Sequence, residues 1–338
     1  MSQRTKDLEN WVSKKLENPF EIKPIQGDAS FRHYFRIYAD DKTWIAVDAP
    51  PTHENNPAFV AITRLFEAHQ VSTPRVLAYD FEQGFMLLSD LGDQLLLDAL
   101  NPENSESWYL KSFDVLQNIQ QCSTAGSYEI PVFDRKHSLL ELGYFTEWCL
   151  NQLLSLSLSS SEKTLIYDLF QKLVLVFEKQ PMRVIHRDFH SRNLLIQSDQ
   201  TLATIDYQDA MIGPITYDLV SLLKDCYIQW DELLISKWAG LYHARLKEEG
   251  LKVSLDEFTQ WFDWVGIQRH LKVLGIFSRL KIRDNKARYL KDMPRILRYL
   301  EAALSRYPEL NGFNGFFQEN LMPSFAAFFE REGIEKAA

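Results

Sequence analysis

The sequence predicts an α+β protein with two lobes, a small β-rich N-terminal lobe at residues 1–90 and a large, mostly helical lobe at residues 91–338. Apolar residues recur at strand spacing in short runs before residue 90, and at helical spacing in long runs after it. A length of 338 residues suits two lobes around one site, and 46% apolar with 25% charged residues is typical of a globular chain.

The N-terminal lobe begins with an amphipathic helix that ends before Pro19. Alternating apolar and polar residues predict strands at residues 30–38, 44–47, 75–79 and 85–88. A helix is predicted at residues 56–70, between the second and third of these strands. The lobe is therefore expected to be a small antiparallel sheet that carries one long helix.

Helical spacing dominates the large lobe. Helices are predicted at residues 93–100, 106–122, 136–153 and 162–180, and the most linker-like segment is 155–161. Three brief apolar strands follow at residues 184–186, 194–197 and 202–205, and helices then continue almost to residue 338.

Composition excludes several classes of protein. A net charge of −9 fits poorly with a protein that coats nucleic acid or anionic membrane. The three cysteines are widely separated and form no C-x-x-C pair, as expected of reduced thiols. The first residues lack the apolar core of a signal peptide, and no run approaches 18 apolar residues. We therefore expect a cytoplasmic protein without nucleic-acid, membrane or obligate protein partners.

Common nucleotide-binding and hydrolase signatures are absent. The chain contains no G-x-G-x-x-G, no G-x-x-x-x-G-K-[ST], no G-x-S-x-G and no H-E-x-x-H. These absences disfavour a dinucleotide-binding dehydrogenase, a P-loop enzyme, an α/β-hydrolase and a zinc protease.

The chemistry-bearing motif is H-R-D-x-x-x-x-N at residues 186–193, followed by an aspartate after the next strands. This spacing suits phosphoryl transfer. Asp188, on a loop after a strand, can accept the proton of an attacking hydroxyl. Asn193 and Asp206 can supply oxygen ligands to Mg²⁺ from two adjacent strand ends. The motif predicts a kinase that uses ATP and Mg²⁺.

Each residue of this motif has a structural alternative when taken singly. Asp188 could be a turn residue, Asn193 a helix cap, and Asp206 the residue that ends an edge strand. His186 and His190 are four apart, but the segment between them is not helical and no third metal ligand is evident. A structural role that fixes the loop is the better interpretation of His186.

The order of these motifs along essentially the whole chain resembles the aminoglycoside phosphotransferase/choline kinase branch of the protein-kinase-like fold. The resemblance implies a two-lobe kinase fold in which Asp218, within residues 213–219, braces the catalytic loop as a structural residue. Residues 27–36, 47–51 and 268–277 look like those of bacterial anomeric kinases. Those enzymes phosphorylate C1 of N-acetylmuramate and N-acetylglucosamine during cell-wall recycling, so the resemblance implies a small-molecule sugar substrate.

For the sugar, Asp188 is expected to contact the anomeric hydroxyl, and Gln208 and Asp209 lie just beyond the metal aspartate in the sequence. Arg269 and His270 are further candidates, because a guanidinium suits an anionic group such as a lactyl carboxylate.

One motif departs from the kinase pattern. Kinases carry a lysine at the end of V-A-I-K, whereas residues 45–48 here end in Asp48. We expect Asp48 to pair with Arg64 on the helix at 56–70, so that the charges are exchanged. Arg32 or Arg36 would then reach the triphosphate, with the Ser30 hydroxyl and the turn before it.

The hinge between the lobes falls at residues 88–91, where backbone groups would read adenine. The candidate nucleotide-binding residues there are Leu88, Ser89, Asp90 and Leu91. Ala46 and Ile205 would supply apolar walls for the base, although both could equally be core residues.

Two other functions remain open. The acceptor could be another small alcohol, such as an aminoglycoside or a choline-like amine, although the basic stretch at residues 279–298 disfavours a cationic substrate. The chain could instead be a nucleotide-binding pseudokinase that regulates a partner, which the missing strand lysine would support. A protein kinase is disfavoured because no D-F-G or A-P-E follows Asp206.

Overall fold

The computed structural model describes residues 2–25, 31–123 and 128–335, which fall into two compact units. Unit 1 contains the described residues up to 131 together with 186–188 and 192–211. Unit 2 contains 132–185, 189–191 and the described residues from 212 onward. The compact units thus do not follow the predicted division at residue 90, because the described residues of 91–131 and much of the 186–211 segment group with the earlier residues in unit 1. Separate roles for 1–90 and 91–338 stay a prediction.

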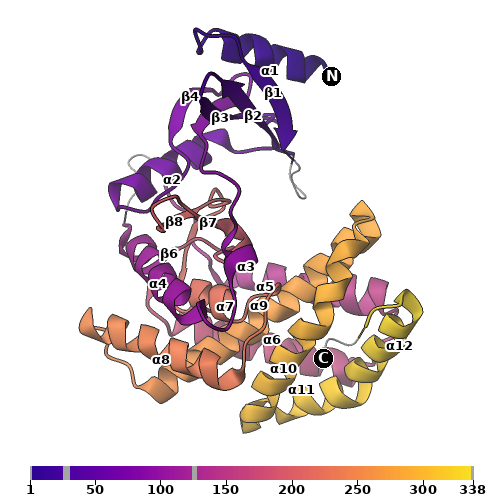
Figure 1. Ribbon diagram of the computed structural model, residues 1–338. Coiled ribbons are helices and arrows are strands. Elements are labelled where there is room, and N and C mark those ends of the chain that lie inside the picture. Colours follow the sequence, from indigo (N-terminus) through magenta and orange to yellow (C-terminus); the bar gives the residue numbers. More distant parts are fainter. Residues whose placement is uncertain (1, 26–30, 124–127, 336–338) are drawn as a thin grey trace. The chain divides into compact units, whose positions relative to one another are not determined.

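An antiparallel sheet of five strands in the order β1-β2-β3-β5-β4 forms the first part of unit 1 (Figure 1). The strands are β1 (Glu21–Ile25), β2 (His33–Ala39), β3 (Lys42–Asp48), β4 (Val76–Asp80) and β5 (Phe85–Ser89). The four predicted strands are confirmed. Sequence spacing missed β1, an edge strand that contains Pro24 and is mostly exposed, because it shows no clear alternation.

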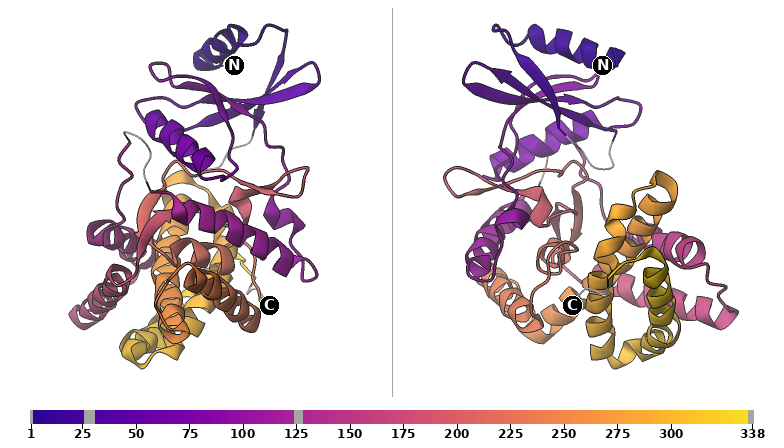
Figure 2. Two further views of the ribbon diagram at one scale, coloured as in Figure 1. Left: turned by 90° about the vertical axis from the view of Figure 1, so that its left-hand side faces the viewer. Right: turned by 45° about the vertical axis from the view of Figure 1, so that its right-hand side comes forward.

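Helix α1 (Gln3–Ser13) covers one face of the sheet, and α2 (Asn56–Ala68) lies on the other side of it (Figures 1 and 2). The α1 face is an apolar cluster made by the helix and three strands. Its buried members are Leu8, Trp11, Val12, Ile37, Ala46, Phe85 and Leu87. The Asn55 side chain caps α2 by accepting a hydrogen bond from the backbone N–H of Ala58.

The remainder of unit 1 groups residues 186–188 and 192–211, which carry the predicted site, with the described residues up to 131. It contains α3 (Leu96–Ala99), α4 (Ser105–Gln121), the short helix η2 (Ser191–Asn193), whose first residue belongs to unit 2, and the antiparallel pair β7 (Leu194–Ile196) and β8 (Leu202–Thr204). The backbone N–H of Ile196 donates to Gln94, and that of Thr204 donates to Ser72. Strands β7 and β8 are therefore bonded to segments on either side of the predicted hinge at residues 88–91.

Unit 2 is built around the 30-residue helix α9, which packs against α5, η1, α6, α7 and α10. Its elements are α5 (Arg135–Tyr144), η1 (Phe145–Leu153), α6 (Ser160–Glu178), β6 (Met182–Ile185), β9 (Met211–Pro214, whose first residue belongs to unit 1), α7 (Tyr217–Leu223), α8 (Glu232–Glu248), α9 (Leu255–Asp284), η3 (Ala287–Asp292), α10 (Met293–Arg306), η4 (Pro308–Leu310), α11 (Asn311–Phe316), η5 (Phe317–Leu321) and α12 (Met322–Glu332). None of the helices in the described part of the chain combines the length and the apolar character that a membrane crossing requires.

Gly275 lets α9 approach the junction of α5 and η1. A Cβ on Gly275 would lie 2.4 Å from the carbonyl carbon of Tyr144 and 2.6 Å from the backbone nitrogen of Phe145. Backbone atoms of a packed helix cannot yield as a flexible side chain can, so we expect Gly275→Ala to destabilise the protein by about 2 kcal/mol or more. Thermal unfolding followed by circular dichroism measures this loss.

Gly240→Ala in α8 is the matched control, because a Cβ there would meet no atom within 4 Å. Its midpoint of unfolding should be unchanged or slightly higher, as expected of glycine to alanine in a helix. Equal midpoints for Gly275→Ala and the wild type would contradict the packing argument.

Candidate active site

The segment at residues 186–206, which follows β6 and carries the predicted site, contains two residues with unusual backbone conformation. Arg187, directly before Asp188, has φ of +76°, and Asp206 has φ of +64°. Non-glycine residues seldom adopt this left-handed region, and such strain is concentrated at functional sites. The two acidic side chains predicted to perform the chemistry thus lie at or next to strained positions.

Hydrogen bonds bring the three predicted residues together. The side-chain nitrogen of Asn193 donates to the backbone carbonyl of Asp188 at 2.9 Å. The backbone carbonyl of Asn193 in turn accepts from Ile205 N–H at 3.0 Å, one residue before Asp206. Asp188, Asn193 and Asp206 belong to the same compact unit. Their roles stay predictions, but the spacing in the sequence does become proximity in the fold.

The electrostatics of Asp206 are those of a carboxylate among like charges. Desolvation by the surrounding protein atoms is the main effect that raises the pKa of Asp206 to about 6, although the side chain keeps some contact with solvent. The negative charges of Asp188 and Asp209 raise this pKa further. Gln208 opposes it by donating a hydrogen bond to Asp206 at 2.7 Å. Two neighbouring carboxylates that repel one another are a favourable place for a cation.

The donor set fits Mg²⁺ bound together with a nucleotide. No group of three or more His, Cys, Asp or Glu side chains in the described ranges could hold a metal ion by itself. Mg²⁺ usually takes one or two carboxylates, with phosphate oxygens and waters completing its octahedron. The hydrogen bond to the Asp188 carbonyl uses the Asn193 nitrogen, so it does not occupy the amide oxygen, which is the atom that would bind a metal ion.

The two histidines of the motif, His186 and His190, have different surroundings. His186 is fully buried, and its Nε2 forms a 2.6 Å hydrogen bond with Thr204 Oγ1 at the end of β8. The ring of His190 packs edge-on against Tyr227, 5.3 Å away. Burial and this hydrogen bond favour a structural role for His186, and its fixing of the loop stays a prediction. Asp218, in the first turn of α7, is fully buried, and its bracing role stays a prediction.

The hinge segment is held on several sides. The backbone N–H of Ser89 donates to Arg75, and the Leu91 carbonyl accepts from the Gln197 side chain at 3.1 Å. Leu88 is buried in β5, whereas Ser89, Asp90 and Leu91 are partly exposed. Hydrogen bonding to an adenine base would require a backbone that is both accessible and held in place, and residues 89–91 meet both conditions.

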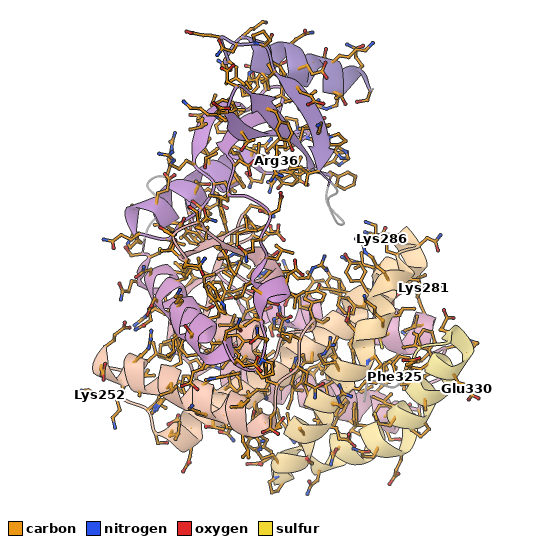
Figure 3. The ribbon with its side chains drawn as sticks, viewed as in Figure 1. Arg36, Lys252, Lys281, Lys286, Phe325 and Glu330 are labelled. Atoms are coloured by element: carbon orange, nitrogen blue, oxygen red, sulfur yellow. The ribbon has the colours of Figure 1, made fainter. Side chains whose placement is uncertain are left out.

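Arg36 connects β2 to this hinge. Its guanidinium donates to Asp93 at 2.6 and 2.7 Å and to Asp90 at 3.1 Å, on the side of the sheet away from α1 (Figure 3). Asp90 also accepts from the N–H of Gly92. Because two carboxylates already surround Arg36, its environment favours a role in holding the hinge over a direct grip on the triphosphate.

The expected pairing of Asp48 with Arg64 is wrong. Asp48 forms an ion pair with Arg4 of α1, and the guanidinium of Arg64 lies 5.9 Å from the ring centre of Tyr79. The reason is the pleat of β3, since alternate residues face opposite sides of the sheet. Ala46 shares the parity of Asp48 and is fully buried in the α1 cluster, which favours a core position over a wall for the base.

The remaining candidates lie as follows. Ser30 is outside the described residues. Gln208 and Asp209 follow Asp206 in unit 1, with Asp209 exposed. In unit 2, Arg269 is buried and donates to Ser221 Oγ at 2.5 Å, and His270 is buried with its Nε2 on the Lys224 carbonyl at 3.1 Å. These contacts favour a structural role for Arg269 and His270 over contact with a sugar.

Three residues that sequence reasoning missed enter the site description. They are Arg4, which pairs with Asp48, Glu54, which pairs with Arg32, and Tyr34, whose buried hydroxyl is influenced by Arg32 and Asp206. The alternation of β2 could have signalled Tyr34, which shares the face of Arg36. The partners of Asp48 and Arg32 lie 44 and 22 positions away along the chain, and no local pattern connects them.

The fold and the site define a phosphotransferase of the protein-kinase-like class. The chain belongs to the phosphotransferase enzyme family, whose model matches residues 21–255. It is 39% identical over 294 residues to the N-acetylmuramate/N-acetylglucosamine kinase of Pseudomonas aeruginosa, covering 86% of each chain. It is 36% identical over 316 residues to the protein of that name from Neisseria meningitidis, covering 91% of this chain and 93% of the other.

Solved structures of low identity show the same fold. The choline kinase LicA of Streptococcus pneumoniae matches with a TM-score of 0.62 at 13% identity, over 89% of this chain and all of that one. The GDP complex of aminoglycoside 2'-phosphotransferase-IIIa matches with a TM-score of 0.60 at 16% identity, over 89% and 98%. The expected α+β, protein-kinase-like fold is thereby confirmed.

Proposed function

We propose that this protein is an ATP-dependent, Mg²⁺-requiring kinase that phosphorylates the anomeric C1 hydroxyl of N-acetylmuramate and N-acetylglucosamine. The observation that carries the proposal is the hydrogen-bonded arrangement of Asp188, Asn193 and Asp206 in unit 1. Identity of 34–39% over 86–91% of the chain to three proteins named N-acetylmuramate/N-acetylglucosamine kinase supports the choice of acceptor.

In this proposal the C1 hydroxyl oxygen of the sugar attacks the γ-phosphorus of ATP, and Asp188 accepts the proton of that hydroxyl. The bond from the γ-phosphorus to the bridging oxygen breaks on the opposite side, and ADP leaves. Asn193 and Asp206 would hold Mg²⁺, which offsets the charge that develops on the phosphoryl oxygens. Gln208 and Asp209 are proposed to bind the sugar beside Asp188. Transfer is direct, because no serine or histidine is placed as a nucleophile by the motif.

A coupled ADP-release assay tests the acceptor. N-acetylmuramate, N-acetylglucosamine, glucose, choline and kanamycin are offered separately with ATP and Mg²⁺. We expect the two N-acetylated amino sugars to be turned over, and ³¹P NMR of the product to show a 1-phosphate. Turnover of choline or kanamycin alone would replace the proposed acceptor, and absence of turnover with bound nucleotide would indicate a pseudokinase.

The hinge contacts lead to a prediction for Arg36. Arg36→Ala removes the group that holds Asp90 and Asp93, so the adenine-reading backbone should lose its fixed geometry. We expect KM for ATP to rise about tenfold and the preference for ATP over GTP to decrease, with the KM for sugar unchanged. Steady-state rates with both nucleotides measure this, with Lys42→Ala on β3 as an exposed control. An unchanged nucleotide preference and ATP KM would contradict a hinge role.

A further inference from the structure

The strand position at which kinases carry a phosphate-binding lysine is occupied in this chain by an aspartate, Asp48. In protein kinases, a lysine on the third strand binds the α- and β-phosphates of ATP, and a glutamate on a helix forms an ion pair with this lysine. Here Asp48 stands at the matching position, faces α1 and pairs with Arg4. The β3 strand thus offers no cation at this place, although a bound triphosphate requires one near the metal site.

A buried ion pair between the residue directly before strand β2 and the turn before helix α2 offers such a cation. Arg32 Nε lies 3.2 Å from Glu54 Oε2, and their side chains are only 2% and 15% exposed. The guanidinium also lies 5.3 Å from the ring centre of Phe59 on α2. Ion pairs this buried are costly to desolvate, so a structural purpose alone would be served as well by apolar residues.

The partner glutamate is fixed by its surroundings. Glu54 directly precedes the cap of α2, and its backbone N–H donates to Pro50 at 3.0 Å. The neighbouring ring of His53 stacks on Phe31 at 4.3 Å, which ties this turn to the start of β2. Glu54 therefore pairs with Arg32 from the turn directly before the N-terminus of α2, as the helix glutamate of kinases pairs with the strand lysine.

The pair lies close to the candidate metal site. The ring of Phe59, over which the guanidinium of Arg32 lies, stacks on the ring of Tyr207 with 5.3 Å between the ring centres, and Tyr207 directly follows Asp206. Burial raises the pKa of the Tyr34 hydroxyl to about 12, and the charges of both Arg32 and Asp206 act on this hydroxyl. Arg32 is thus within electrostatic reach of the oxygen that would bind Mg²⁺.

We propose that Arg32 and Glu54 together replace the lysine–glutamate pair of kinases. Arg32 contacts the α/β-phosphates of the nucleotide, and Glu54 is a positioning residue that orients the guanidinium. A guanidinium has five N–H donors in a rigid fork, so it can serve a carboxylate and a phosphate together. This inference rests on the proposed nucleotide-dependent function.

Glu54→Gln tests the positioning role, since it removes the charge and keeps the shape. We expect Mg²⁺·ADP affinity, measured by calorimetry without sugar, to fall about tenfold, which corresponds to about 1.4 kcal/mol. The KM for sugar should stay within twofold. Arg32→Lys should weaken nucleotide binding similarly, and the double variant should lose less than the product of the two effects, because the residues act as a unit. Glu82→Gln, in the exposed turn before β5, is the control.

The outcomes separate the two proposals. Wild-type affinity for Mg²⁺·ADP in both Glu54→Gln and Arg32→Lys would overturn the assignment, as would a lower unfolding midpoint without a change in affinity. A wild-type protein that binds Mg²⁺·ADP but phosphorylates no amino sugar would overturn the proposed acceptor and leave Arg32–Glu54 standing. A wild-type protein that binds no nucleotide would overturn both.

Discussion

Replacing Asp188 by Asn should reduce kcat about a thousandfold while leaving nucleotide affinity intact or slightly higher. Asparagine keeps the shape of the side chain but cannot take a proton from the sugar hydroxyl. The backbone carbonyl of Asp188 that accepts from Asn193 is unaffected by the substitution. Removal of the negative charge also lowers the pKa of Asp206, because Asp188 contributes to its rise. Initial rates at saturating substrates and calorimetry with Mg²⁺·ADP measure the two effects.

Asp199→Asn is the control for this experiment, because Asp199 lies in the exposed turn between β7 and β8 and bonds only its local neighbour Thr201 among the contacts observed. Its kcat should equal that of the wild type. An Asp188→Asn enzyme that keeps more than about a tenth of the wild-type kcat would exclude Asp188 as the general base.

The parts of the site that lie within one short segment could be predicted from sequence. Asp188 and Asn193 are five positions apart, and Asp206 ends the next hairpin, so the local order of strand, loop and strand sets their proximity. The strands β2, β3, β4 and β5 were predicted for a similar reason, since alternation along one strand reports which of its residues are buried.

The contacts between distant segments could not be predicted in this way. A period of two shows that Ala46 and Asp48 share a face, but it does not show that α1 covers that face. Pairing of Asp48 with Arg4 then follows from tertiary packing and not from any local pattern. Arg36 is a similar case, because its partners Asp90 and Asp93 come from a segment 54 and 57 positions away.

Asp206→Asn should have opposite effects on activity and on stability. Loss of the carboxylate removes the strongest proposed ligand of Mg²⁺, so we expect kcat at 1–10 mM Mg²⁺ (about the usual assay range) to fall at least about a hundredfold. Higher Mg²⁺ should recover part of the loss, since Asn193 and the nucleotide would still coordinate. Rates as a function of Mg²⁺ concentration measure this, and wild-type dependence on Mg²⁺ would contradict the assignment.

The stability effect follows from the raised pKa. The folded state holds the Asp206 proton up to about pH 6, whereas the ordinary carboxyl value is 3.8, so this group's contribution to stability declines as pH rises from 3.8 through 6. Asparagine removes that decline. In metal-free buffer, Asp206→Asn should therefore unfold at a higher temperature than the wild type at pH 7, and at a similar temperature near pH 4. Asp80→Asn is the matched control, because hydrogen bonds from Gln83 lower the pKa of Asp80 and its replacement should not stabilise the protein. A lower midpoint for Asp206→Asn at pH 7 would show that the ionised carboxylate stabilises the fold. That result would contradict the claim that repulsion among neighbouring carboxylates destabilises the metal-free site.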